Sequence, residues 1–168
     1  MFEFKRVCDH YENMSTEERR YLLTEKATSI FEWLKNSLVS GIDPVNVLFG
    51  FILGSVTADG KINEMEYLLI YPILKKVFGN EVDFTAFKDS FQRSKDGKKL
   101  IDDYTKKMEN IFTLLDEELK RDVVMLCLGV TSIDGKITLK EKRYIRHLCE
   151  KCFDVEKAWR CSTNLKQK

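Results

Sequence analysis

The chain has 168 residues, of which 43% are hydrophobic and 11% aromatic, which is enough apolar material for one domain with a single core. Its 28 basic and 27 acidic residues nearly cancel, so a net charge of +1 provides no long-range field and we expect no nucleic-acid partner. The longest apolar run, residues 47–56, is shorter than the ~20 residues that span a bilayer, and we expect no membrane span. The start has no signal-peptide pattern and the five cysteines are scattered, so we expect free thiols in a cytoplasmic protein.

Apolar residues recur at intervals of three and four along almost the whole chain, and strand-like alternation is scarce. We therefore predict an all-α fold, a compact bundle of seven or eight helices. A single domain is expected over residues 1–162, followed by a frayed tail at 163–168.

The first predicted helix starts with a capping box, in which Ser15 and Glu18 each accept a hydrogen bond from the other's backbone amide. Gly41 is expected to end this helix. Asp43 and Pro44 then start a second helix over about 44–57, which is apolar on nearly all sides and is expected to be the most buried. The apolar stripe of the first helix comprises Leu23, Ala27, Ile30, Phe31, Leu34 and Leu38.

Five further helical segments are predicted along the rest of the chain. One covers about 64–78 and is kinked at Pro72, because proline cannot donate the next hydrogen bond of the helix. Asp83 and Asp116 are predicted caps, since aspartate accepts from the free amides of a first helical turn. The other predicted helical segments are 84–93, a stripe through 100–115, 117–132 and 139–153.

A motif occurs twice in the chain, as TADGKINEMEY at 57–67 and as SIDGKITLKEK at 132–142. The longer segments 53–70 and 128–145 align with eight identical positions. Each copy joins a buried helix to an amphipathic one. We expect the two copies, about 43–79 and 117–153, to pack about an approximate two-fold axis within one bundle.

A buried helix that ends in Ala-Asp-Gly-Lys-Ile, with Glu four residues later, resembles the TerB-like family of tellurite-resistance proteins, which includes the amino-terminal domain of the DjlA membrane co-chaperones. The match covers Leu53 to Ile70, and the second copy matches the internal duplication of the family. The second copy departs from the pattern at Ile133, where the first copy has the preferred small residue, Ala58.

The resemblance implies an all-helical, non-enzymatic module that is linked to stress response. It also implies a candidate metal site, because metal binding has been proposed for the acidic positions of such domains. In this chain those positions are Asp59, Glu66, Asp134 and Glu141.

Comparison with a calcium-binding loop leaves two interpretations of these acidic residues. If Gly60 takes the sixth position, then Asp59 and Glu66 fall at positions 5 and 12, but Ser55 and Thr57 stand where carboxylates are usual, at positions 1 and 3. Each loop thus offers two carboxylates. A divalent cation such as Ca²⁺ or Mg²⁺, including one shared between the loops, is the alternative to a structural role.

The structural interpretation, which we favour, assigns the same residues to turns and helix caps. Asp-Gly is a turn signal, since aspartate accepts from amides just ahead and glycine tolerates positive φ. Asn63 with Glu66, and Thr138 with Glu141, have the spacing of capping boxes. The residues expected to enter the core beside the two turns are Ile62 and Ile137.

A third candidate site is formed by His147, Cys149 and Cys152 on one predicted helix. Thiolates and imidazole are zinc ligands, but no second Cys/His pair stands at zinc-finger spacing. The two cysteines continue the apolar stripe of their helix, which favours a role in the core. The chain contains no phosphate-binding glycine loop, nucleophile elbow or His-Glu-x-x-His motif. We therefore predict no catalytic residues, no bound cofactor and a non-enzymatic protein with a protein partner.

Overall fold

The computed structural model describes most of the amino-terminal segment, the helix Pro44–Val56 with parts of the segment that follows it, and the carboxy-terminal hairpin. Every regular element in this part of the chain is helical, which confirms the all-α prediction. Single helical turns occur at 64–68, 84–86 and 110–114. The longer helices are α1 (Phe2–Glu12), α2 (Thr16–Asn36), α3 (Pro44–Val56), α7 (Glu117–Thr131) and α8 (Leu139–Cys152). The described residues are 2–36, 44–58, 62–68, 71, 83–86, 89, 99, 106 and 110–152.

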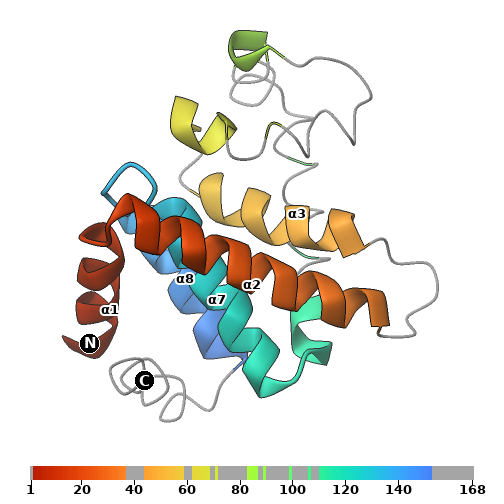
Figure 1. Cartoon of the computed structure of the whole chain (residues 1–168). Coiled ribbons are helices and arrows are strands. Elements are labelled where there is room, and N and C mark those ends of the chain that lie inside the picture. Colours follow the sequence, from red (N-terminus) through yellow and green to blue (C-terminus); the bar gives the residue numbers. More distant parts are fainter. Residues whose placement is uncertain are drawn as a thin grey trace.

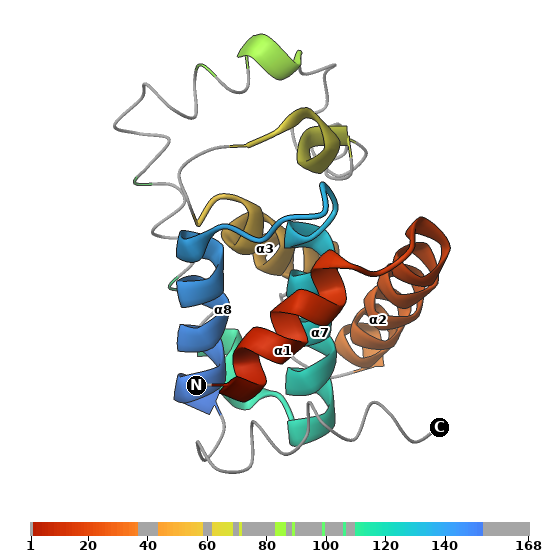
Figure 2. The same cartoon turned by 90° about the vertical axis from the view of Figure 1, so that its left-hand side faces the viewer.

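Helix α7 lies at the centre of the bundle. It packs against α1, α2, α3 and α8, and Figures 1 and 2 show these helices arranged around it. Residues 126–132, at the carboxyl end of α7, are buried without a break, as are residues 50–57 around the end of α3. The prediction of a deeply buried second helix is therefore confirmed, and α7 shares that role.

Two close contacts explain how α7 packs so tightly. Cys127 Sγ lies 3.7 Å from the Phe51 carbonyl oxygen, which brings α7 against the backbone of α3. On the other side, a Cβ atom at Gly129 would lie 3.0 Å from Leu23 Cδ2 and 3.1 Å from Leu22 Cδ2. Glycine at position 129 therefore allows α2 to approach α7 closely, because interiors are packed without spare volume.

The predicted caps account for where the helices begin. Ser15 N donates to Glu18 Oε2 at 3.0 Å and Glu18 N donates to Ser15 Oγ at 3.2 Å, as a capping box requires. Asp116 Oδ1 accepts from Leu119 N at 2.8 Å, and Asp83 Oδ1 accepts from the amides of the following turn. Consequently α3, α7 and α8 begin at the predicted residues and end within one residue of the predictions.

Helix α1 was not predicted from the sequence. Cys8 and Tyr11 are buried against the core, and Phe4 and Val7 pack against it in part. These four residues have the spacing of one helical face, and this pattern could have been used to predict the helix. The stop at Gly41, the kink at Pro72 and the tail at 163–168 lie outside the described residues.

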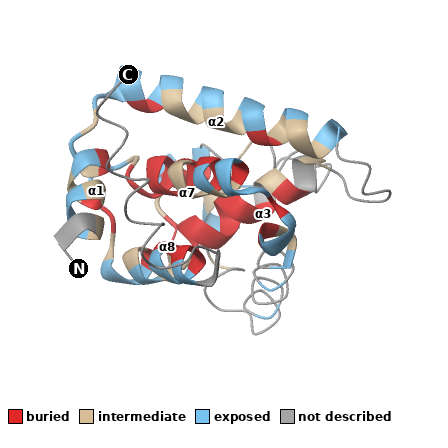
Figure 3. Ribbon diagram, turned by 90° about the horizontal axis from the view of Figure 1, so that it is seen from below, coloured by how far each residue is buried: buried red, intermediate tan, exposed pale blue. Residues whose placement is uncertain are grey.

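No helix in the described ranges combines the length and the apolar character needed to cross a bilayer. The residues that are buried instead form one core around α7, as Figure 3 shows in red. The second Asp-Gly motif follows the end of α7, and the first, residues 59 and 60, lies outside the described residues.

Candidate functional site

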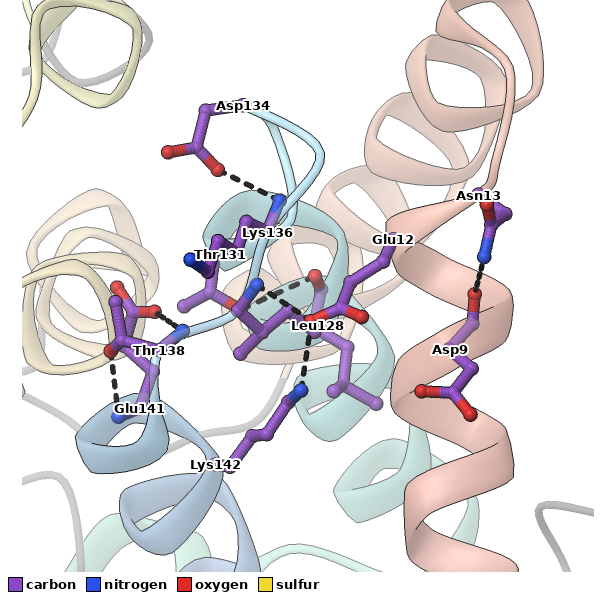
Figure 4. A network of polar contacts seen from close by, with 11 residues as sticks. Asp9, Glu12, Asn13, Leu128, Thr131, Asp134, Lys136, Thr138, Glu141 and Lys142 are labelled. Carbon is purple, nitrogen blue, oxygen red and sulfur yellow. Dashed lines mark hydrogen bonds and ion pairs between the residues drawn. The ribbon is translucent and has the colours of Figure 1, made fainter.

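The second Asp-Gly motif forms a tight turn, which we call the second corner (residues 132–138). Gly135 adopts φ of +83°, a conformation that favours glycine. Asp134 Oδ1 accepts from Lys136 N at 3.0 Å, and Gly135 N donates to the Ser132 carbonyl at 2.9 Å (Figure 4). The turn predicted for this motif is confirmed.

Both glutamates of the repeated motif are buried helix caps. Thr138 N donates to Glu141 Oε2 at 2.7 Å (Figure 4), and Glu141 N donates to Thr138 Oγ1 at 3.3 Å. In the first corner (residues 57–63), Asn63 N donates to Glu66 Oε2 at 2.8 Å and Glu66 N donates to Asn63 Oδ1 at 2.9 Å. Glu66 and Glu141 are only 4% and 3% exposed. The predicted capping boxes are confirmed in both copies.

The hydroxyl groups at the first and third positions of the compared calcium loop belong to helix ends. Ser55, Thr57 and Ser132 donate to carbonyls three or four residues earlier in their own helices, at 2.8, 2.6 and 3.2 Å. All three are buried. Their oxygens therefore do not converge with a loop carboxylate, as the ligands of a calcium loop do.

The two corners meet at one contact. Asn63 Nδ2 donates to Asp134 Oδ2 at 3.3 Å, so the cap of the first corner touches the turn of the second. Asp134 is exposed, whereas the carboxylates of Glu66 and Glu141 accept from backbone amides. Asp59 lies outside the described residues.

The described members of the candidate metal site do not gather around a common point. Across the described stretches, no three His, Cys, Asp or Glu side chains come together in a group that could hold a metal ion. Glu66 and Glu141 would have to give up backbone hydrogen bonds to bind a cation, and Asp134 alone among the described carboxylates of the site is exposed.

The amino-terminal helix is bonded to the second corner through Glu12. Glu12 Oε1 accepts from Ile137 N at 2.9 Å and from Lys142 Nζ at 2.8 Å (Figure 4). Burial alone would raise the pKa of Glu12, but the hydrogen bonds from Lys142 and Ile137 outweigh it and hold that pKa below its ordinary value. The same ion pair outweighs burial at Lys142 and raises its pKa.

Arg19 bonds the turn between α1 and α2 to the same corner. Its Nη1 donates to the Ile133 carbonyl at 3.1 Å, and its Nη2 donates to the carbonyls of Tyr11 and Met14 at 2.9 and 3.2 Å. Burial lowers the pKa of Arg19, and the negative charge of Asp134 opposes this effect. We call Glu12 and Arg19, with these contacts, the amino-terminal clamp.

Sequence analysis missed both residues of the clamp. A signal existed for Arg19, because it stands four residues before Leu23 and thus in line with the apolar stripe of α2. A charged residue in such a stripe is expected to be paired when the face is buried. For Glu12 the sequence holds no comparable signal, since its partners are more than 120 residues away.

The third candidate site divides between the surface and the core. Cys149 is buried, as the structural interpretation expected, while His147 is exposed. The side chain of Cys152 lies outside the described residues. Burial also raises the pKa of Cys8 to about 11 and that of Cys127 to about 12, so these two thiols stay protonated and are poor ligands or nucleophiles.

Comparison of the chain with models of protein families, with curated proteins and with solved structures finds no match.

Proposed function

We propose that the chain is a non-enzymatic, TerB-like helical module that works by binding another protein. The observation that carries this proposal is a pair of exposed apolar side chains directly after the first corner. Met65 and Leu68 are 51% and 58% exposed and stand one helical turn apart, so they form one contiguous apolar patch. Contiguous exposed apolar patches mark protein-interaction sites.

The pair is held in place by the cap beneath it. The capping box of Asn63 and Glu66 orients the helical turn, and Tyr67 on its other side is buried. The contact between Asn63 and Asp134 also ties this turn to the second corner. A binding face built on such support loses little conformational freedom when a partner docks.

An internal duplication, as the TerB-like resemblance implies, accounts for several shared features. The aligned segments 51–57 and 126–132 are both buried, and each is followed by an isoleucine in the core and then by a capping box. The contact between Cys127 and Phe51 lies one residue from the aligned pair 51 and 126, where a two-fold axis would bring equivalent residues together. A role in stress response or tellurite resistance comes from the resemblance alone.

The test is affinity purification of the full chain from native lysate. The expected result is a protein that is retained by the wild type and lost, by at least about tenfold, with the double variant Met65→Ser, Leu68→Ser. A matched control is Leu114→Ser, because Leu114 is as exposed and lies in another helical turn. The proposal is contradicted if the wild type retains no protein, or if the double variant retains the partner as well as the wild type does.

A second candidate function is divalent-cation binding across the two corners. It is supported by the hydrogen bond between Asn63 and Asp134, which places the exposed carboxylate of Asp134 next to the first corner. A bound ion raises the melting temperature by mass action. Ca²⁺ or Mg²⁺ at millimolar concentration should therefore raise it for the wild type and not for Asp59→Asn, Asp134→Asn. The absence of a shift in the wild type would remove this candidate.

A further inference from the structure

The outward faces of α2 and α8 carry opposite charge. On α2 the exposed stripe, which we call the acidic face, comprises Glu17, Tyr21, Glu25 and Glu32. On α8 the exposed stripe, which we call the basic face, comprises Leu139, Lys140, Arg143 and Arg146. The members of each stripe are three, four or seven residues apart and thus share one side of their helix.

Each stripe keeps its sign when the charges beside it are included. Beside the acidic face, Arg20 and Lys35 are exposed and Glu25 is bonded to Lys26 at 3.0 Å, while the exposed Glu18 adds a further negative charge. Glu150 stands at the end of the basic face and is bonded to Arg146 at 2.7 Å. Because the whole chain is nearly neutral, this separation of charge is a property of the fold and not of the composition.

The two faces lie on opposite sides of the bundle. Figure 2 shows α2 and α8 flanking α7, and Figure 3 shows their exposed sides facing away from each other. The two faces therefore cannot pair within one chain. Each also bears one large apolar side chain in contact with water, since Tyr21 is 71% exposed and Leu139 is 75% exposed.

We propose that a second copy of this chain docks its basic face on the acidic face of the first. Opposite charge steers the approach and selects the orientation. Tyr21 and Leu139 add apolar contacts to the charge pairs. The ring of Tyr21 can also form a cation–π contact with Arg143 of the next copy. Because the two surfaces differ, the contact is head-to-tail and leaves one free face at each end, so copies add on as concentration rises.

An acidic peptide would match the basic face alone. A second copy is favoured because it accounts for both faces and for both exposed apolar residues. This inference goes beyond the proposed function, because it uses neither Met65 nor Leu68 and does not depend on the TerB-like resemblance.

The first test measures the molar mass of the full chain by sedimentation over a range of protein and salt concentrations. We expect mass to rise with protein concentration at about 50 mM salt and the apparent affinity to fall by about tenfold at about 500 mM, because salt screens exposed charges. A wild type that remains monomeric at low salt and ~0.5 mM protein overturns the proposal, whatever acidic peptide it binds.

The second test exchanges the charges. Glu17→Lys, Glu32→Lys gives a chain with two basic faces, and Lys140→Glu, Arg143→Glu gives a chain with two acidic faces. Each variant alone should be monomeric. An equimolar mixture should associate into alternating chains, because the unchanged basic face of the first variant fits the unchanged acidic face of the second and the two reversed faces fit each other. Melting curves of both variants establish that they are folded. Failure of the mixture to associate, or association of either variant alone, overturns the proposal.

Discussion

The two corners share one local structure but differ in what surrounds them. In both, an asparagine or threonine and a glutamate cap the next helix, and the isoleucine just before the cap is buried. The second corner is additionally bonded to the amino-terminal clamp, through Glu12 and Arg19. In the described residues, the two copies therefore share the buried isoleucine and the capping box, and the contacts with the amino-terminal clamp are described for the second copy.

The largest effect should come from the isoleucines, where the two corners are expected to behave alike. Ile62→Ala and Ile137→Ala each remove a buried side chain and should each cost about 3 kcal/mol of unfolding free energy. Urea unfolding of the two variants measures this. A loss below about 1 kcal/mol at one site would show that the corners differ in the core as well as in their surroundings.

Replacement of Arg19 should affect the two corners differently, because Arg19 is bonded to the second corner. Arg19→Ala removes the hydrogen bonds that the guanidinium donates to three carbonyl groups and should cost about 2 kcal/mol. Hydrogen exchange should become faster at Ile133 and its neighbours but stay unchanged at Ile62. The exposed Arg20→Ala variant is the control and should be within about 0.5 kcal/mol of the wild type.

Substitution of Gly135 tests whether the first corner has the same turn. At φ of +83° a side chain is strained, so Gly135→Ala should cost about 1.5 kcal/mol. Steric contact adds little, since a Cβ would lie 3.9 Å from the nearest atom, the Glu12 carbonyl oxygen. Gly135→Asn should cost less, because asparagine tolerates this region. If Gly60→Ala lowers the unfolding free energy by the same amount, the first corner has the same turn.

The smallest effect should come from Glu12, and it should depend on pH. Because the folded pKa of Glu12 lies below its ordinary value of 4.5, its contribution is present above that pH and is lost as the pH falls through the folded pKa. Glu12→Gln should therefore cost about 1 kcal/mol near pH 7 and much less near pH 3. Urea unfolding at both pH values checks this, and a difference that persists in acid would contradict the role of the carboxylate.

Much of the candidate site was predictable because its contacts are local. The capping boxes at Asn63 and Thr138 join residues three apart in the chain, so the spacing of the motif was enough to predict them. The turn at Gly135 follows from the Asp-Gly dipeptide for the same reason. The clamp was not predictable, because Glu12 and Arg19 reach partners 125 and 114 residues away.

Helix α1 shows the same limit at the level of a whole element. Its apolar face is short, and its burial depends on packing against α7 and the core that distant helices form. Isolated helices of this length are marginal in water, so a short amphipathic pattern becomes a stable helix only when it packs. The sequence contains the amphipathic pattern, but the surface against which α1 packs forms only in the folded bundle.

The sequence by itself determined the helical class, the starts of the main helices and the two capped corners, because hydrogen bonds within one helical turn depend on residues a few positions apart. Tertiary structure alone decided that Gly129 allows α2 to approach, that the clamp holds one corner, and that the acidic and basic faces point in opposite directions. These features depend on how distant surfaces fit together, and that fit is a property of the packed core rather than of any one segment.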